Sequence, residues 1–171
     1  MLDKRSKEHV LPIEIYTDGS LKKLGQKMTF GGWAYVVVQD QKEIYYACDC
    51  EENTTNQRME LTAIAEALDY INQNRRPSER VIVYSDSAYI INCYLQEWYI
   101  KWQCNGWQTS NKNDVANQDL WRRIIPYFDN FWYDFRKVTG HKGNYWNEFC
   151  DTLAQNESNK IKERRRKANN V

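Results

Sequence analysis

The 171-residue sequence lacks both a long apolar run and paired cysteines. No uninterrupted apolar stretch approaches the roughly 20 residues of a membrane span, and residues 1–7 contain no apolar stretch like that of a secretory signal. The five cysteines are an odd number and include no C-x-x-C pair, so neither a disulfide framework nor a zinc site is indicated. We therefore expect free thiols, a reducing cytoplasmic location and no membrane partner.

The chain also has little net charge, but the charge that it has is unevenly distributed. The net charge is +1. Residues 160–171 carry six basic side chains against Glu163, a local net charge of +5, which leaves −4 for the rest of the chain. Such a segment is typical of a solvated helix end or of disorder, and attraction to polyanions is a second interpretation.

The composition is that of a packed domain. Apolar residues make up 42% of the chain and aromatic residues 14%, and a chain of this length suits one domain with a full core better than two. We expect a polar N-terminal arm over residues 1–10, one domain over 11–158 and a basic C-terminal tail over 159–171.

Hydrophobic periodicity predicts strands first and helices later. Residues 11–17, 33–38 and 44–48 read as strands joined by short loops and hence as antiparallel neighbours, with a turn at 18–20. Helical spacing then begins near residue 61, with Thr54 or Thr55 as the N-cap.

Strand and helix patterns alternate through the second half of the chain. After a break at Pro77 we expect a strand over 81–84, a helix from near Ser87 and, beyond an aromatic-rich segment, a helix carrying Leu120. A strand over 131–138 and a helix from about residue 146 into the tail complete the order β-β-β-α-β-α-α-β-α. This order predicts an α/β fold, with a five-stranded mixed sheet in the order 3-2-1-4-5 flanked by helices.

Four acidic residues stand close to predicted element boundaries: Asp18, Glu60, Asp86 and Asp151. Each alone has an ordinary explanation, as a turn residue, a first-turn helix acid, a helix cap or a solvent-facing helix residue. The predicted sheet would gather all four. Carboxylates at one point repel unless hard cations sit between them, so together they predict a magnesium site.

Five short blocks around these acids carry a resemblance to a known family. They are residues 16–20 (YTDGS), 54–61 (TTNQRMEL), 84–87 (YSDS), 138–143 (VTGHKG) and 147–154 (NEFCDTLA). In this order they strongly resemble ribonuclease H type 1, and the resemblance covers about residues 11–156. It implies a mixed sheet and an endoribonuclease that cleaves the RNA of RNA–DNA hybrids, leaving 5′-phosphate and 3′-hydroxyl ends.

The resemblance also implies roles for individual residues. Asp18, Glu60, Asp86 and Asp151 would be catalytic and would bind two Mg²⁺ ions, with Mn²⁺ as a possible substitute. Asp18 would bridge the ions, Glu60 and Asp86 would serve the leaving-group side, and Asp151 the side that activates water. His141 would assist proton transfer or product release, which suits its ordinary pKa of about 6.5.

The expected contacts to the hybrid surround these acids. They are Gly19, Ser20, Thr55, Asn56, Gln57, Arg58, Trp98, Trp102 and Asn147. Asn56 and Gln57 suit 2′-hydroxyl recognition, and Thr55 and Arg58 suit a DNA-strand phosphate, although Thr55 also suits helix capping.

The tryptophan segment has a competing interpretation and an unusual charge. Trp98 and Trp102 share a helical face that would ordinarily be core; the resemblance makes them part of a protrusion that guides the DNA strand. Few basic residues lie near them, so we expect the basic tail to supply phosphate attraction. Where many relatives carry Gln, this chain has Ala88, which removes one possible substrate contact.

Three competing interpretations remain at this stage. A DNA-acting nuclease or integrase-type enzyme on the same fold is disfavoured by Asn56 and Gln57 and by the loop containing His141. A non-catalytic hybrid-binding module should have lost at least one of the four acids. A domain of a reverse transcriptase is disfavoured only weakly, by the length of the chain; the leading expectation is a monomer.

Overall fold

The computed structural model describes residues 11–76, 79–138 and 143–168. Three features expected from the sequence lie outside these ranges: the N-terminal arm over 1–10, the break at Pro77 and the loop histidine His141. Within the described part of the chain, no helix is long and apolar enough to cross a membrane.

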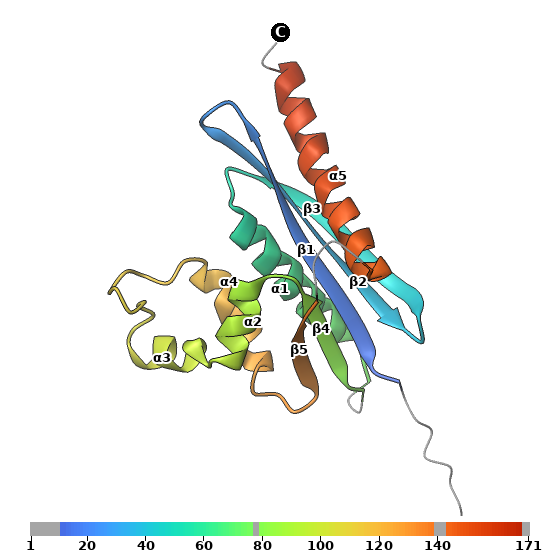
Figure 1. Cartoon of the computed structure of the whole chain (residues 1–171), viewed down its shortest axis with the longest axis vertical. Helices are drawn as coiled ribbons and strands as arrows, with labels where there is room; N and C mark the ends of the chain where they lie inside the picture. Colours follow the sequence, from blue (N-terminus) through green and yellow to red (C-terminus); the bar gives the residue numbers. More distant parts are fainter. Residues whose placement is uncertain (1–10, 77–78, 139–142, 169–171) are drawn as a thin grey trace, which may run out of the picture.

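A five-stranded mixed sheet in the order β3-β2-β1-β4-β5 forms the centre of the fold (Figure 1). The first three strands form an antiparallel meander, while β4 runs parallel to β1 and β5 parallel to β4. The α/β class and the strand order predicted from the sequence are confirmed. The strands are β1 (Ile13–Leu24), β2 (Met28–Gln39), β3 (Lys42–Glu52), β4 (Val81–Ser85) and β5 (Tyr133–Lys137).

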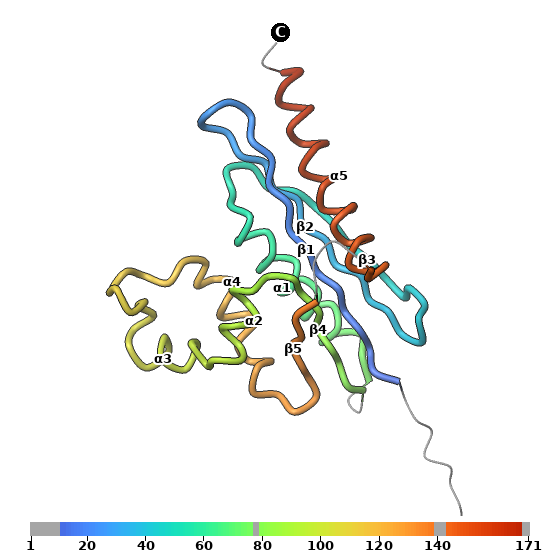
Figure 2. The backbone as a smooth tube through the Cα atoms, in the orientation of Figure 1, coloured from blue at the N-terminus to red at the C-terminus, as the bar shows by residue number. Residues whose placement is uncertain are grey.

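Helices cover both faces of the sheet. One face carries the long helix α5, and the other carries α1 with α2 and α4 beside it (Figures 1 and 2). The short helix α3 adds an element to the predicted order, and α5 continues through the basic residues up to Ala168. The helices are α1 (Asn56–Asn74), α2 (Ala88–Leu95), α3 (Trp98–Cys104), α4 (Gln118–Ile124), the 3-10 turn η1 (Ile125–Tyr127) and α5 (Tyr145–Ala168).

The predicted turn at residues 18–20 was wrong. β1 continues to Leu24, which pairs with Met28, and the chain turns at Gly25, whose φ is +64°. Pairing with β2 along the whole segment overrides the local turn preference of an Asp-Gly-Ser sequence. The parallel pairing of β1 with β4, however, stops at Thr17 and Ser85, so Asp18 is the first residue of β1 beyond it.

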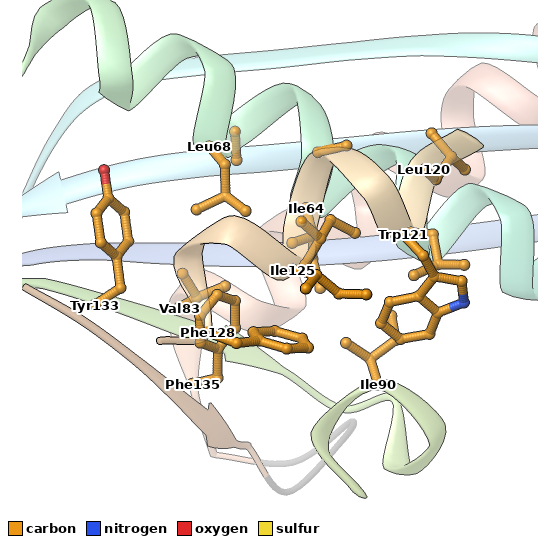
Figure 3. Close-up of a cluster of buried hydrophobic side chains, with 14 of the residues drawn as sticks. Ile64, Leu68, Val83, Ile90, Leu120, Trp121, Ile125, Phe128, Tyr133 and Phe135 are labelled. Carbon is orange, nitrogen blue, oxygen red and sulfur yellow. The ribbon is translucent and has the colours of Figure 1, made fainter. Parts of the chain in front are cut away.

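The two faces of the sheet are packed differently. The α1 face holds the main core, in which α1, β4 and the α4 region meet through large side chains such as Leu68, Val83 and Trp121 (Figure 3). The α5 face is held close by small residues: a Cβ on Gly32 would lie 2.1 Å from the carbonyl oxygen of Ala154. This close approach brings the first turns of α5 against β1 and β2.

Candidate active site

The first turn of α1 touches β1 at Gly19. A Cβ at this position would lie 2.5 Å from the amide nitrogen of Glu60 and 2.8 Å from the carbonyl carbon of Met59. Only glycine leaves room for the helix to approach the strand so closely. The contact therefore sets Glu60 of α1 beside Asp18 of β1.

The other two acids reach Asp18 from β4 and α5. Asp86 follows the last residue of β4, where the parallel pairing with β1 ends. On α5, the Cys150 thiol is buried and donates to the carbonyl oxygens of Tyr16 at 3.2 Å and Ala34 at 3.3 Å. These bonds fix the helix on the sheet and hold the next residue, Asp151, close enough to Asp18 for their charges to interact.

Burial and repulsion make the Asp18 carboxyl unusual. Asp18 as a whole is only 6% exposed. Burial, followed by the charges of Asp86 and Asp151, raises its pKa from 3.8 to about 8, and Glu60 adds to this effect. Burial also raises the pKa of Glu60. The four predicted acids thus form one interacting group, although they come from four separate elements.

Polar neighbours orient two of these carboxylates. Asn56 donates from Nδ2 to Glu60 Oε1 at 2.7 Å, and Ser87 also hydrogen-bonds to Glu60. Gln155 donates from Nε2 to both carboxylate oxygens of Asp151, at 2.8 and 2.9 Å. The roles of Ser87 and Gln155 were missed from the sequence; the spacing of Gln155 four residues after Asp151 was the available signal.

The residues of this group fit a hard divalent cation. One Asp18 oxygen, Oδ1, accepts a hydrogen bond from the Gly19 amide at 2.7 Å, but Oδ2 is buried and has no hydrogen-bond partner among the described residues. A buried carboxylate oxygen lacking a donor calls for a compensating charge. Among the described residues, no three acidic, histidine or cysteine side chains already converge as ligands on one point. Mutual repulsion of like charges opposes such convergence, whereas oxygen ligands are those that magnesium prefers.

The predicted substrate residues at the start of α1 are partly engaged within the protein. The Thr55 hydroxyl caps α1 by accepting from the Arg58 amide at 3.1 Å. The Arg58 guanidinium forms a two-bond pair with Asp119, at 2.9 and 3.2 Å, and contacts Glu51 at 3.3 Å. Contact of Arg58 with a phosphate would have to compete with these acids. Gln57 is half-buried on the first turn of α1.

Two predicted contact residues are buried where α5 packs on the sheet. Ser20 accepts a hydrogen bond from the Ser158 hydroxyl at 3.3 Å and therefore faces the helix. Asn147, in the first turn of α5, is 1% exposed, and within the described part of the chain neither its Oδ1 nor its Nδ2 has a hydrogen-bond partner. Ala88, in contrast, is exposed at the start of α2, directly after Asp86 and Ser87.

The tryptophans of α3 line a pocket and also pack on the core. Trp102 is buried, and its ring meets that of Trp121 edge to face at 5.3 Å. Trp98 is half-buried against Tyr89, with ring centroids 5.9 Å apart. Both tryptophans line a pocket of about 410 Å³ together with Lys101. The segment thus combines a core role with one open aromatic wall.

Comparison with known proteins gives one consistent family. A sequence model of the RNase H family matches residues 11–159. A protein named Ribonuclease H from Syntrophomonas wolfei is 48% identical over 146 residues, which cover 84% of this chain and 94% of the relative. A Ribonuclease H from a Thermoanaerobacter species is 44% identical over 144 residues, covering 83% and 86%.

Solved structures give the same result. The crystal structure of LC9-RNase H1, described as a type 1 RNase H with the type 2 active-site motif, superposes with a TM-score of 0.73 at 25% identity. The match covers 88% of this chain and 73% of that protein.

Proposed function

The chain belongs to the RNase H family, and we propose that Asp18, Glu60, Asp86 and Asp151 are the residues with which it hydrolyses RNA. The activity is that of a ribonuclease H, an endoribonuclease acting on the RNA strand of RNA–DNA hybrids. The observation that carries the assignment of the site is the buried, unpartnered Asp18 Oδ2 within reach of three other carboxylates.

Divalent metal ions are the general cofactors of this family, and we infer that this chain holds two Mg²⁺ ions, for which Mn²⁺ can substitute. Asp18 would be shared between them, with Glu60 and Asp86 on the leaving-group side and Asp151 on the side of the attacking water. When bound, such ions supply a hydroxide at neutral pH and neutralise charge on the departing 3′ oxygen. The products are a 5′-phosphate and a 3′-hydroxyl end.

The protein's own contribution is to hold the carboxylate oxygens of the four acids in place. Gly19 lets α1 approach β1, and Asn56 restrains the Glu60 carboxylate. Gln155 occupies both oxygens of Asp151 from the same helix, which fixes its orientation. His141 is proposed to assist proton transfer or product release.

Recognition of the hybrid is proposed to involve residues on both sides of the acids. Gln57 together with Asn56 would contact 2′-hydroxyls, and the exposed Thr55 can donate its hydroxyl proton to a phosphate while its oxygen caps α1. Asn147 offers a buried amide without a partner. Gly19, Ser20, Arg58, Trp98 and Trp102 complete the proposed contact set.

We further propose a monomeric enzyme in a reducing cytoplasm. All five cysteines are free thiols, and two of them, Cys93 and Cys150, are buried. Free thiols are typical of cytosolic proteins.

Cleavage of three labelled duplexes tests the proposed function. An RNA–DNA hybrid, double-stranded RNA and double-stranded DNA would be incubated with magnesium or with EDTA and resolved on a gel. We expect cutting of the hybrid RNA alone, only with metal, and its loss in Asp18→Asn. The matched control is Asp49→Asn, which removes one negative charge from an exposed position on β3 and should cut normally.

Other outcomes would point to different functions. Hybrid cleavage that survives in Asp18→Asn would refute the proposed centre. Cutting of double-stranded DNA would favour a DNA nuclease on this fold, and hybrid binding without any cleavage would favour a non-catalytic module.

A further inference from the structure

The two sides of α5 differ in what they contact. One flank faces β3, where the Cys48 thiol donates to Glu157. The other flank faces β1, where Asp151 interacts with Asp18 and the Ser158 hydroxyl bonds to Ser20. The β1 flank therefore leads directly from the acidic centre towards the C-terminal end of the helix.

Basic residues continue along this β1 flank. Lys162 lies one helical turn after Ser158 and about three full turns after Asp151, so the three side chains share a face. Arg166 lies one turn further and is exposed. On β1, Lys22 is two residues after Ser20 and so points to the same side of the sheet.

The hairpin and the helix end lie together in space. Figures 1 and 2 show the β1–β2 hairpin next to the C-terminal half of α5, at the end of the molecule away from α3, and the hydrogen bond from Ser158 to Ser20 joins the two segments. Beyond Thr17, β1 no longer pairs with β4, and no other described strand pairs with this side of β1. We call Lys22, Lys162 and Arg166 the basic track.

Within the described ranges, the charges of the basic track form no ion pair. Among the described residues, the ion pairs of the tail are those of Lys160 with Glu157 and of Arg165 with Glu52, at 2.5 and 2.7 Å. Both acids in these pairs lie away from the β1 flank, Glu52 on β3 and Glu157 on the flank facing β3. Beyond Asp151 the charged side chains along this flank are basic, and such a row of like charges attracts a polyanion.

We propose that the basic track binds the sugar–phosphate backbone of the RNA–DNA hybrid beyond the point of cleavage, on the side away from α3. This inference rests on the proposed function and assigns a second phosphate-binding surface to the same substrate. Because α3 has few basic residues, the track would supply attraction for phosphates on the side of the acidic group away from α3. This proposal is more specific than a general attraction by the basic tail, because it assigns phosphate binding to the side chains on one face of α5.

The geometry sets how much duplex the track needs. Lys162 and Arg166 lie about 16 and 22 Å along the helix axis from Asp151, at 1.5 Å per residue. For a duplex that runs parallel to α5, at about 3.4 Å per base-pair step, these distances correspond to roughly five to seven base pairs from the centre. A hybrid that ends about three base pairs from the cut on this side should not reach the track.

Charge-matched double variants test the proposal. K162A/R166A removes two charges of the track, whereas R164A/K167A removes two from the other faces of the same helix. Circular dichroism melting checks that both fold. The long substrate is a duplex in which one strand has a short central block of ribonucleotides, flanked by about ten base pairs of DNA on each side. Two shorter substrates keep only about three flanking base pairs, one on the first side and the other on the second side.

Binding is measured first, by fluorescence anisotropy in EDTA so that no cleavage occurs. Two lost phosphate contacts should lower the slope of log affinity against log salt by about 1.5. The affinity deficit of K162A/R166A should therefore be about eightfold larger at about 50 mM than at about 200 mM salt. Trimming the end of the hybrid that lies over the basic track should abolish the affinity deficit of K162A/R166A. Trimming the opposite end should leave that deficit unchanged.

Cleavage with magnesium then separates this inference from the proposed function. The track contacts substrate away from the reacting atoms, so K162A/R166A should raise KM on the long hybrid and leave kcat unchanged. Equal effects of the two double variants, no effect of either, or a deficit insensitive to trimming would overturn the basic track. Absence of cleavage by the wild-type protein would instead overturn the proposed function.

Discussion

Replacing Asp18 by asparagine should stabilise the metal-free protein while abolishing its activity. Asp18 is 6% exposed, one of its carboxylate oxygens has no hydrogen-bond partner among the described residues, and the carboxyl pKa is raised to about 8 by burial and by Asp86 and Asp151. Asparagine has nearly the same shape and no charge. The substitution removes the repulsion and keeps an oxygen that can accept from the Gly19 amide.

The size of the effect follows from the difference between the folded and unfolded pKa. A carboxyl whose pKa rises on folding destabilises the folded state above its unfolded pKa of 3.8, and the full effect is reached above about 8. The upper limit of this destabilisation is about 1.6 kcal/mol at about pH 5 and about 4 kcal/mol at about pH 7. Since the new amide needs its own partners, we expect a gain of about 2–4 kcal/mol near neutral pH.

Thermal melting in EDTA measures this gain. For a chain of this size it corresponds to a rise in Tm of roughly 5–15 °C near pH 7, and the rise should shrink at about pH 5. Asp49→Asn is the matched control and should melt with the wild type. Magnesium should raise the Tm of the wild type through binding to the folded state, but not that of Asp18→Asn. Equal or lower stability of Asp18→Asn near neutral pH would refute the reasoning.

Substitutions at three further positions test other parts of the site. Gly19→Ala should cost at least 2 kcal/mol in urea unfolding and most of the activity, because its Cβ would lie 2.5 Å from the Glu60 amide; a variant with normal stability and kcat would contradict this packing. Gln155→Leu should lower kcat about tenfold with little change in Tm, since it frees the Asp151 carboxylate. Gln155→Glu, which adds a negative charge beside Asp151, should lower kcat further. Unchanged kcat in both variants would exclude a positioning role for Gln155. Trp98→Ala should raise KM for the hybrid several-fold, by loss of an aromatic contact, and a change in kcat alone would argue against substrate contact.

The sequence was sufficient to predict the strand order and the residues of the acidic group. Strand and helix periods change clearly along the chain, and the pairing of β1 with β4 follows from short loops and crossover geometry. The blocks around Asp18, Glu60, Asp86 and Asp151 are short and well spaced, so they could be located without a structure.

What could not be predicted depends on contacts between distant segments. The length of β1 beyond Asp18 is set by its partner β2, which overrides the local turn preference. The pairing of Arg58 with Asp119 requires α4 to lie beside α1, which no local pattern specifies. The closeness of Gly19 to α1 likewise becomes visible only once the helix is placed on the sheet.

The docking of α5 has a consequence for the timing of activity during synthesis. The hydrogen bond between Cys150 and Tyr16 joins residues 134 positions apart, and that between Ser158 and Ser20 spans 138. Contacts of such long range form late, after the ends of a long loop have been brought together. A ribosome-bound chain therefore carries three of the four acids well before it can position the last one. With Asp151 in its proposed catalytic role, a nascent chain would become able to cut only after α5 has docked onto β1.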